Sequence, residues 1–343
     1  MTRQRHPSED LVGQLRSQLS DRVQAAVPRG STVALVDFPH HDNIGDTAIW
    51  MGERALLRDL AAEVVSVADE DSYSATRIRR AIGPDGVVLL HGGGSFGDLW
   101  PLRQAFRERV IVDFPDHRIV QLPQTVSVNG PQALRSMRSR VQAHGGVVLL
   151  VRDHVSAETC RLQLGVTADV VPDAAFALGP LPRPCRATTA VLCLARSDHE
   201  AAGPVSQSVP GVVVLDWFTG LGSSSLRRRL QVRGRRLAAA GVARAPVSRL
   251  VLGPVWEAGF DRAARHRLDL GTRLLSRGEV VVTDRLHGHI LSLLLGIPHV
   301  VVDTRRGKVG AFIEAFTENS PLVHRAANFA EAQRLALALT TRP

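Results

Sequence analysis

The stretch STVALVDFPHHDNIGDTAIWMGERALLRDLA, residues 31–61, decides the fold class. Its first part, residues 31–38, is a short apolar run rich in β-branched side chains, and such a run predicts a buried strand. Residues 46–61 then repeat apolar side chains at helical spacing. A buried strand followed by an amphipathic helix is the repeating unit of a parallel sheet in an α/β protein.

The same alternation continues along the chain. In the first half, further strands are predicted at residues 63–68, 86–90, 117–123, 145–153 and 168–173. In the second half, strands are predicted at 188–195, 211–216, 248–254, 279–284 and 297–303, with helices at 223–241, 260–278 and 286–296. The proline-rich segment GPLPRPCRA, residues 179–187, separates the halves as a linker. We therefore predict two Rossmann-like domains, residues 1–178 and 179–343, that face a central cleft, with ligands beyond the carboxyl ends of the strands.

Composition and charge restrict the function. The 343 residues carry a net charge of +9 and 44% of them are hydrophobic, so the chain can bury a substantial core. The basic residues are almost all arginine, with Lys308 the one lysine, and an excess of arginine favours phosphate or carboxylate ligands or an anionic membrane surface. Nucleic acid is not expected as a partner, because the arginines are spread along the chain, with few aromatic residues among them and no zinc-finger or RNA-recognition signature.

Cysteine usage and hydropathy indicate the compartment. The three cysteines, Cys160, Cys185 and Cys193, lack metal-ligand spacing, and we expect them to be reduced. The N-terminal segment is polar, without the apolar core of a signal peptide, and the longest apolar runs are too short to span a membrane. We therefore expect a cytoplasmic protein, in which the arginine-rich residues 226–236 either contact the inner face of an anionic membrane or form a solvated helix face.

The glycine-rich stretch VLLHGGGSFGDLW, residues 88–100, matches three enzyme motifs that exclude one another. Gly92, Gly94 and Gly97 fit the dinucleotide pattern G-x-G-x-x-G, but the next strand does not end in the acidic residue that the ribose requires. The same residues contain both HGGG and G-x-S-x-G, which an esterase must place on separate loops. A tight turn explains one glycine but not three in a row. The bare backbone instead predicts that a ligand approaches the main chain closely.

Charged side chains follow other predicted strands. Asp46 opens the helix after the first strand, and we expect it to cap that helix, to contact a ligand, or both. Arg152 directly follows a strand, where it either faces the cleft or forms a surface pair with Asp153. Lys308 lies in a basic segment after the last of these strands, and the alternative for this segment is a solvated run of charge.

The segment VVTDRLHGHILSLLLGIPHVVVD, residues 281–303, holds the densest group of polar side chains. Arg285 and His287 come where a strand passes into an apolar helix, and a helix N-terminus with an arginine and a histidine is a good anion site. His287 can also move a proton near neutral pH, although a buried structural histidine would show the same pattern. His289, two residues further on, is expected to point away from the cleft.

Taken together, these motifs resemble the polysaccharide pyruvyl transferase family over residues 35–315. The resemblance is carried by DNIGDTAI, LLHGGGSFGD, QLPQTV, VRDHVS, VPDAAFAL, LARSDHE and TDRLHGHILSLLLGIPHVVVD followed by GK. It implies a GT-B-like fold and the transfer of pyruvate from phosphoenolpyruvate (PEP) onto two hydroxyls of a sugar, which makes a cyclic ketal and releases phosphate. It implies neither a metal nor a cofactor, since PEP is a co-substrate.

The resemblance also implies roles for single residues. His287 is implied in catalysis and in PEP binding, with Arg285 beside it and with Arg152 and Lys308 as further donor-site residues. A carboxylate must take protons from the sugar hydroxyls, and Asp46 and Asp98 are both candidates. Acceptor binding is assigned to the N-terminal half and PEP binding mainly to the C-terminal half. The candidate acceptor residues are Asn43, Gly45, Asp46, Gly92, Gly93, Gly94 and Ser95.

The acceptor itself stays open on the sequence alone. A free sugar, a nucleotide sugar and a lipid-linked glycan all fit, and the oligomeric state is not indicated. The tryptophans Trp50, Trp100, Trp217 and Trp256 either stack on sugar rings or belong to the core. Two other classes of function remain: a GT-B-type glycosyltransferase that uses a nucleotide sugar, and a non-catalytic sugar-binding protein.

Overall fold

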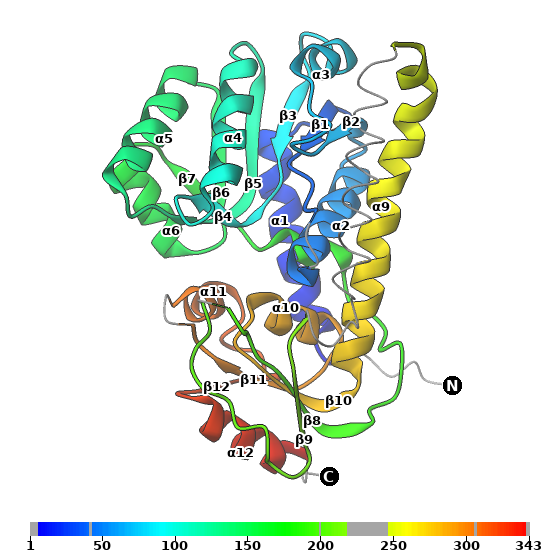
Figure 1. Ribbon diagram of the computed structural model, residues 1–343, viewed down its shortest axis with the longest axis vertical. Helices are drawn as coiled ribbons and strands as arrows, with labels where there is room; N and C mark the ends of the chain where they lie inside the picture. The colour runs from blue at the N-terminus through cyan, green and yellow to red at the C-terminus, as the bar shows by residue number, and fades with distance from the viewer. Residues whose placement is uncertain (1–5, 41–42, 199, 218–245, 305–306, 341–343) are drawn as a thin grey trace.

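The computed structural model describes residues 6–40, 43–198, 200–217, 246–304 and 307–340, of which residues 246–257 are described by their backbone alone. The strands form two parallel sheets, one from each half of the sequence, and helices cover the faces of both (Figure 1). This confirms the predicted α/β class with parallel sheets.

The first sheet has the strand order β2-β1-β3-β5-β6-β7, and β4 pairs with the last residues of β5. Its strands are β1 (Thr32–Val36), β2 (Glu63–Ala68), β3 (Val87–Leu90), β4 (Gly93–Gly97), β5 (Arg118–Ser127), β6 (Val147–Val151) and β7 (Ala168–Val170). Every residue of β3 is buried, as expected for an inner strand of a parallel sheet that is covered on both faces.

The second sheet has the strand order β12-β11-β10-β8-β9. Its strands are β8 (Thr189–Leu194), β9 (Val212–Leu215), β10 (Gly278–Thr283), β11 (His299–Val302) and β12 (Val323–Ala326). Because β10 lies between β8 and β11, the residues that follow β10 emerge at the middle of the sheet edge. Arg285 and His287 are among these residues.

Helices and helical turns connect the strands. The first half contains α1 (Glu9–Ala26), α2 (Ile44–Asp59), α3 (Ala75–Ile82), α4 (Pro101–Asp113), α5 (Pro131–His144), α6 (His154–Thr159), a π-helical turn η1 (Cys160–Leu164) and a 3₁₀ turn η2 (Ala174–Leu178). The second half contains α9 (Pro246–Ser276), α10 (Leu286–Leu294), α11 (Lys308–Phe316) and α12 (Phe329–Thr340). In the part of the chain that the structure describes, no helix combines the length and the apolar character needed to cross a bilayer.

One hydrophobic core reaches from the first sheet to the second. It includes Val33 and Leu35 of β1 as well as Leu192 of β8 and Val281 of β10. Helix α9 runs beside α2 (Figure 1), and Asp261 of α9 accepts hydrogen bonds from the side chains of Trp50 and Arg54. The boundary at residue 178 therefore stays a prediction, because a helix from beyond it packs on the first half.

Two of the sequence predictions, for residues 248–254 and for the glycine stretch, differ from the structure. The strand predicted at residues 248–254 is wrong, since these residues lie in α9. A short apolar run does not by itself distinguish a buried strand from part of a helix. The glycine stretch is also not simply a loop that leads into a helix, because residues 93–97 form strand β4 and α4 starts only at Pro101. The predicted helix 223–241 and the arginine-rich residues 226–236 lie outside the described residues.

Two buried histidines, His289 of α10 and His299 of β11, contact each other. His289 does not line the cavity between the two sheets, in agreement with the prediction that it points away from the cleft. His289 Nδ1 lies 2.8 Å from His299 Nε2, and its Nε2 lies 3.0 Å from Thr317 Oγ1. His299 Nδ1 lies 2.8 Å from the carbonyl oxygen of Ile297. These partners suit two neutral rings, each with one N–H donor and one acceptor nitrogen. Burial lowers the pKa of His299 to about 4 and lowers the pKa of His289 well below its ordinary value.

We expect acid to destabilise the fold through this pair. The unfolded chain binds a proton on each histidine below about pH 6.5, whereas folded His299 stays neutral until the pH approaches about 4. The contribution of neutral His299 to the free energy of unfolding is therefore complete above about pH 6.5. About 3 kcal/mol of it is lost as the pH falls from 6.5 to 4. Melting temperatures between pH 7.5 and 4.5 should fall less steeply for His299→Asn than for the unaltered protein. Equal slopes would show that other groups cause the acid sensitivity.

Candidate active site

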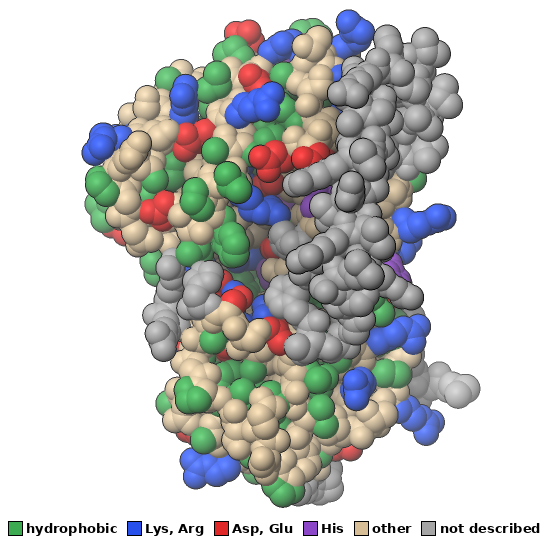
Figure 2. Space-filling view, in the orientation of Figure 1, with side chains coloured by type: hydrophobic (Ala, Val, Ile, Leu, Met, Phe, Trp, Pro, Cys, Tyr) green, Lys and Arg blue, Asp and Glu red, His purple; other side chains and the backbone are tan. Residues whose placement is uncertain are grey.

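A cavity of about 270 Å³ opens between the two sheets, at the carboxyl ends of their strands. From the first half it is lined by Asn43, Asp46, Gly94, Ser95, Trp100, Arg103 and Arg152. From the second half it is lined by Arg196, Asp198, Glu200, Trp217, Asp284, Arg285, Leu286, His287, Thr304, Lys308 and Val309. Figure 2 shows acidic and basic side chains mixed at this level of the molecule.

The start of α10 supplies two of the residues expected from the second half, Arg285 and His287. Arg285 is the N-cap residue of α10, and its backbone N–H donates to Thr283 Oγ1 at 3.0 Å. The side chain of Arg285 is buried and pairs through Nη2 with Asp216 Oδ1. Every residue of α10 is buried, so this helix start is held rigidly at the cavity. Arg285 and His287 both line the cavity, so the structure brings them together.

His287 is held between Asp173 and Gly45. Its Nε2 lies 3.4 Å from Asp173 Oδ2. A Cβ atom on Gly45 would lie 2.5 Å from His287 Nδ1, so only glycine lets the imidazole approach α2 this closely. Gly45, predicted to bind acceptor, does not line the cavity and instead makes room for His287.

Arg152 shares the same aspartate from the other side. Its Nη1 donates to Asp173 Oδ2 at 2.6 Å, and its Nε donates to Thr125 Oγ1 at 2.9 Å. Burial raises the pKa of Asp173, but the charges of His287 and Arg152 outweigh it and hold this pKa below its usual range. The surface pair of Arg152 with Asp153 is wrong, because Asp153 caps α6 through Ser156 N. Asp173 thus fixes both a histidine and an arginine of the cavity.

The two candidate base carboxylates have different surroundings. Asp46 lines the cavity in the first turn of α2, where Asn43 Nδ2 donates to its Oδ2 at 3.1 Å. Asn43, not Asp46, is the N-cap residue and accepts from Gly45 N.

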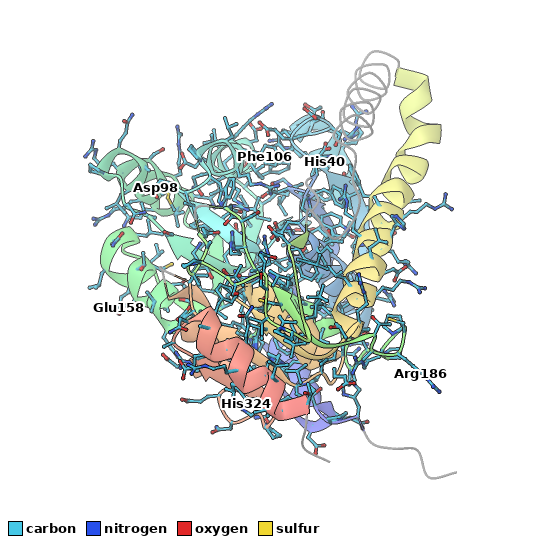
Figure 3. All side chains as sticks on the ribbon, turned by 60° about the horizontal axis from the view of Figure 1, so that its bottom comes forward. His40, Asp98, Phe106, Glu158, Arg186 and His324 are labelled. Carbon is cyan, nitrogen blue, oxygen red and sulfur yellow. The ribbon has the colours of Figure 1, made fainter. Side chains whose placement is uncertain are left out.

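Asp98, labelled in Figure 3, lies outside the cavity lining and contacts Gly130, the N-cap residue of α5. Its carboxylate accepts the backbone N–H groups of Asn129 and Gly130. Burial raises the pKa of Asp98, but these hydrogen bonds outweigh it and lower the pKa overall. Asp98 therefore stabilises this turn, whereas Asp46 lies at the cavity.

Of the glycine stretch, residues 88–100, Gly94, Ser95 and Trp100 line the cavity. Gly92 lies deeper, and its N–H donates to Glu53 Oε1 at 2.7 Å. Gly93 has φ +122°, a conformation that side chains rarely adopt, and does not line the cavity. The acceptor role predicted for Gly92 and Gly93 is therefore not supported by their positions, and their backbone geometry explains them better.

Gly93→Ala and Gly94→Ala should change different properties, stability in the first variant and KM in the second. Gly93→Ala should lower stability by about 1–3 kcal/mol, because the backbone at φ +122° strains any side chain. A Cβ on Gly94 would lie 3.1 Å from Arg152 Nη2, so Gly94→Ala should displace the guanidinium. The KM for PEP, the donor that the sequence resemblance implies, should then rise by about tenfold. Melting curves and steady-state kinetics on both variants test this. A change of KM at Gly93 alone would reverse the assignment.

Sequence reasoning missed two groups of residues here. Glu53 of α2 and His91 form a fully buried pair, with Oε2 and Nδ1 2.7 Å apart, which ties α2 to the start of the glycine stretch. Burial raises the pKa of Glu53, partly offset by His91.

The second group surrounds Glu200, whose carboxylate accepts from Arg196 Nη2 at 2.6 Å and from Lys308 Nζ at 2.7 Å. Arg196 and Glu200 belong to the segment LARSDHE, one of those that carry the family resemblance. The sequence did not indicate what these two residues do. Lys308 is thus held at the cavity by an ion pair and is not part of a solvated run of charge. Among the described residues, no three histidine, cysteine or acidic side chains are grouped so as to hold a metal ion.

Comparisons with known proteins agree with this arrangement. A family model described as polysaccharide pyruvyl transferase matches residues 43–306. Pyruvyl transferase 1 of Schizosaccharomyces pombe is 35% identical over 289 residues, which cover 81% of this chain and 67% of the yeast protein. The Bacillus subtilis protein EpsO, provisionally named a pyruvyl transferase, is 28% identical over 313 residues, which cover 90% of this chain and 92% of EpsO.

A solved structure is similar as well. A functionally uncharacterised protein of Klebsiella pneumoniae superposes with a TM-score of 0.57 at 13% identity, over 92% of this chain and 99% of that one. At this identity the likeness concerns the fold alone. The family model, by contrast, spans most of the chain, from Asn43 at the start of α2 past His287 in α10. The residues that line the cavity and the sequence matches thus lead to the same result, and the chain belongs to the polysaccharide pyruvyl transferase family.

Proposed function

We propose that this protein transfers pyruvate from PEP onto two hydroxyls of a sugar or glycan, with formation of a cyclic ketal and release of phosphate. In this proposal the two sheets belong to two Rossmann-like domains of GT-B type, and the cavity between them is the active site. The observation that carries it is the meeting of Asp46, Arg152 and His287, from distant parts of the sequence, around one cavity with Arg285. Arg152 and Arg285 supply cations for an anionic donor, His287 supplies an acid, and Asp46 supplies a base.

Donor binding falls to the cations of the cavity. PEP carries a phosphate and a carboxylate, and arginine matches both groups through parallel N–H donors. Arg152 keeps Nη2 for the ligand, because Nε and Nη1 are engaged by Thr125 and Asp173. Arg285 and Lys308 bind from the second half, and the ion pairs with Asp216 and Glu200 fix their positions. A preformed arrangement of this kind needs little reorganisation when the anion binds.

Proton delivery to PEP starts the reaction. C2 of PEP is poorly electrophilic until C3 accepts a proton, and His287 donates that proton, leaving an oxocarbenium-like C2. Asp173, which is ionised, orients the ring and balances its charge. The first sugar hydroxyl then attacks C2, and phosphate leaves as its C–O bond breaks. The second hydroxyl attacks the same carbon and closes the ring.

Asp46 accepts protons from the attacking hydroxyls. It lies on the first-sheet side of the cavity, near Gly94 and Ser95, where the acceptor binds. Of the two protons that the sugar loses, one replaces the proton that His287 gave to C3, and the other leaves with phosphate. The protons therefore balance over one turnover without any further reactant.

Incubation with PEP and a panel of sugars, nucleotide sugars and lipid-linked sugars tests this function. We expect phosphate release that depends on one class of acceptor, together with a product whose mass has increased by one pyruvyl ketal. The variant Asp46→Asn should bind PEP and release phosphate slowly or not at all. Release of a nucleotide from a sugar nucleotide, with PEP left intact, would favour a glycosyltransferase instead. Tight sugar binding without turnover would favour a non-catalytic protein.

A further inference from the structure

We propose that the acceptor carries an anionic group, a phosphate or a carboxylate, and that Arg103 binds this group while Trp100 stacks on the sugar ring. The inference rests on the proposed function and adds the class of the acceptor. Trp100 and Arg103 belong to the start of α4, and both line the cavity on the first-sheet side.

Arg103 shares the carboxylate of Asp37 with a second arginine of the same helix. Asp37, at the end of β1, pairs with two arginines of α4: its Oδ2 lies 2.7 Å from Arg107 Nη2, and its Oδ1 lies 3.4 Å from Arg103 Nη1. Arg107 is fully buried and also donates to the carbonyl oxygen and the hydroxyl of Ser95. Asp37 is therefore neutralised chiefly by Arg107, and Arg103 is the outer, weakly held cation of the three groups.

Most of the N–H donors of Arg103 make no hydrogen bond to the described residues. Its guanidinium has five N–H donors, and among the described residues its side-chain contact is the single long one to Asp37. The other cavity cations on the donor side are held by shorter contacts, with Arg152 on Asp173 at 2.6 Å and Lys308 on Glu200 at 2.7 Å. The side chain of Arg103 is 23% exposed and lines the cavity, so its remaining donors are accessible to a ligand there.

Trp100 differs from the buried tryptophans in its exposure. Trp50 and Trp217 are fully buried, whereas Trp100 is 44% exposed and lies at the cavity. An indole that stays partly in water at a polar cavity suits contact with the C–H face of a sugar ring. Because Trp100 and Arg103 are three positions apart on one helix start, their side chains lie on the same side. A sugar ring that stacks on Trp100 would bring its anionic substituent within reach of Arg103.

The donor site does not require Arg103. The two anionic groups of PEP are matched by Arg152, Arg285 and Lys308, which leaves Arg103 as a surplus cation on the side of Asp46 and Ser95. A guanidinium with open donors binds phosphate or carboxylate in a bidentate manner. The arginine therefore selects acceptors that carry such a group and orients them relative to Asp46.

Matched sugars and two arginine variants test the proposal. The probes are the methyl glycoside, the 1-phosphate and the uronic acid of glucose, galactose and mannose. Arg103→Gln removes the cation while Asp37 keeps Arg107. Arg109→Gln is the control, because Arg109 lies on the same helix, is 61% exposed and does not line the cavity. Binding is measured by calorimetry in the absence of PEP, and KM is measured wherever turnover occurs.

We expect at least one anionic sugar to bind about ten- to hundredfold more tightly than its neutral glycoside, with the preference lost in Arg103→Gln and kept in Arg109→Gln. Preference for the 1-phosphate indicates a nucleotide- or lipid-linked acceptor, and preference for the uronic acid indicates an acidic glycan. The proposal is overturned if neutral glycosides bind equally well, if no sugar of the panel binds, if Arg103→Gln keeps the preference, or if it raises the KM for PEP instead. Absence of phosphate release with intact anionic preference would refute the proposed reaction but not this binding site.

Discussion

His287→Gln is expected to lose about a hundred- to ten-thousandfold in kcat while the protein still binds PEP. Glutamine approaches histidine in length and keeps a hydrogen-bonding group, but its amide does not deliver a proton to carbon. The loss should therefore appear in the chemical step and not in donor affinity. Phosphate release gives kcat, and calorimetric titration with PEP gives the dissociation constant of the variant.

The surroundings of His287 make this substitution interpretable. Gly45 leaves space beside the ring, and Asp173 on its other side still has Arg152 as a partner when the imidazole is removed. Only 8% of His287 is exposed, yet it lines the cavity, so the substitution changes the site and leaves the core of α10 in place.

His289→Gln is the matched control on the same helix. Its ring is fully buried against His299 and Thr317, away from the cavity. This variant should melt at a lower temperature and keep a kcat close to that of the unaltered protein. If His289→Gln is the inactive variant, or if His287→Gln turns over normally, the identity of the acid is wrong.

The fold could be predicted largely because strands buried on both faces are continuous apolar runs. The runs at residues 86–90 and 188–195 are continuous apolar segments, and they became β3 and β8. The run at residues 248–254 looked the same, but it continues into the long helix α9, and a window of seven residues does not contain that information. Strand β4 was missed because three glycines favour a loop locally. Its pairing with β5 decides otherwise.

The candidate site was predictable where a residue directly follows a strand. Arg152 and Arg285 were found in this way, since the strand ends of a parallel sheet meet at one edge. Partners across the molecule were not predictable. Asp173 holds Arg152 and His287 together, and the two are far apart in sequence. Asp98 resembled Asp46 in sequence, and only its hydrogen bonds to Asn129 and Gly130 reveal a structural role.

Arg152→Ala should raise the KM for PEP by about a hundredfold or more and should also destabilise the protein. A charge-assisted contact to a buried ligand typically accounts for about 2–5 kcal/mol when one partner is truncated. The same substitution removes the 2.6 Å partner of Asp173, and breaking a buried pair costs about 3–5 kcal/mol. A loss of activity in this variant alone would therefore not separate ligand binding from folding.

The double variant Arg152→Ala with Asp173→Asn makes that separation. Asparagine is nearly the same size as aspartate but carries no charge, so the buried carboxylate no longer lacks its arginine and part of the melting temperature should return. The KM for PEP should stay high, because the guanidinium that we propose to contact the donor is still missing. Recovery of both quantities together would mean that Arg152 acts only through the scaffold. A selective rise in the KM for sugar would assign Arg152 to the acceptor side, since Gly94 and Ser95, the residues proposed to bind the acceptor, lie in the same cavity.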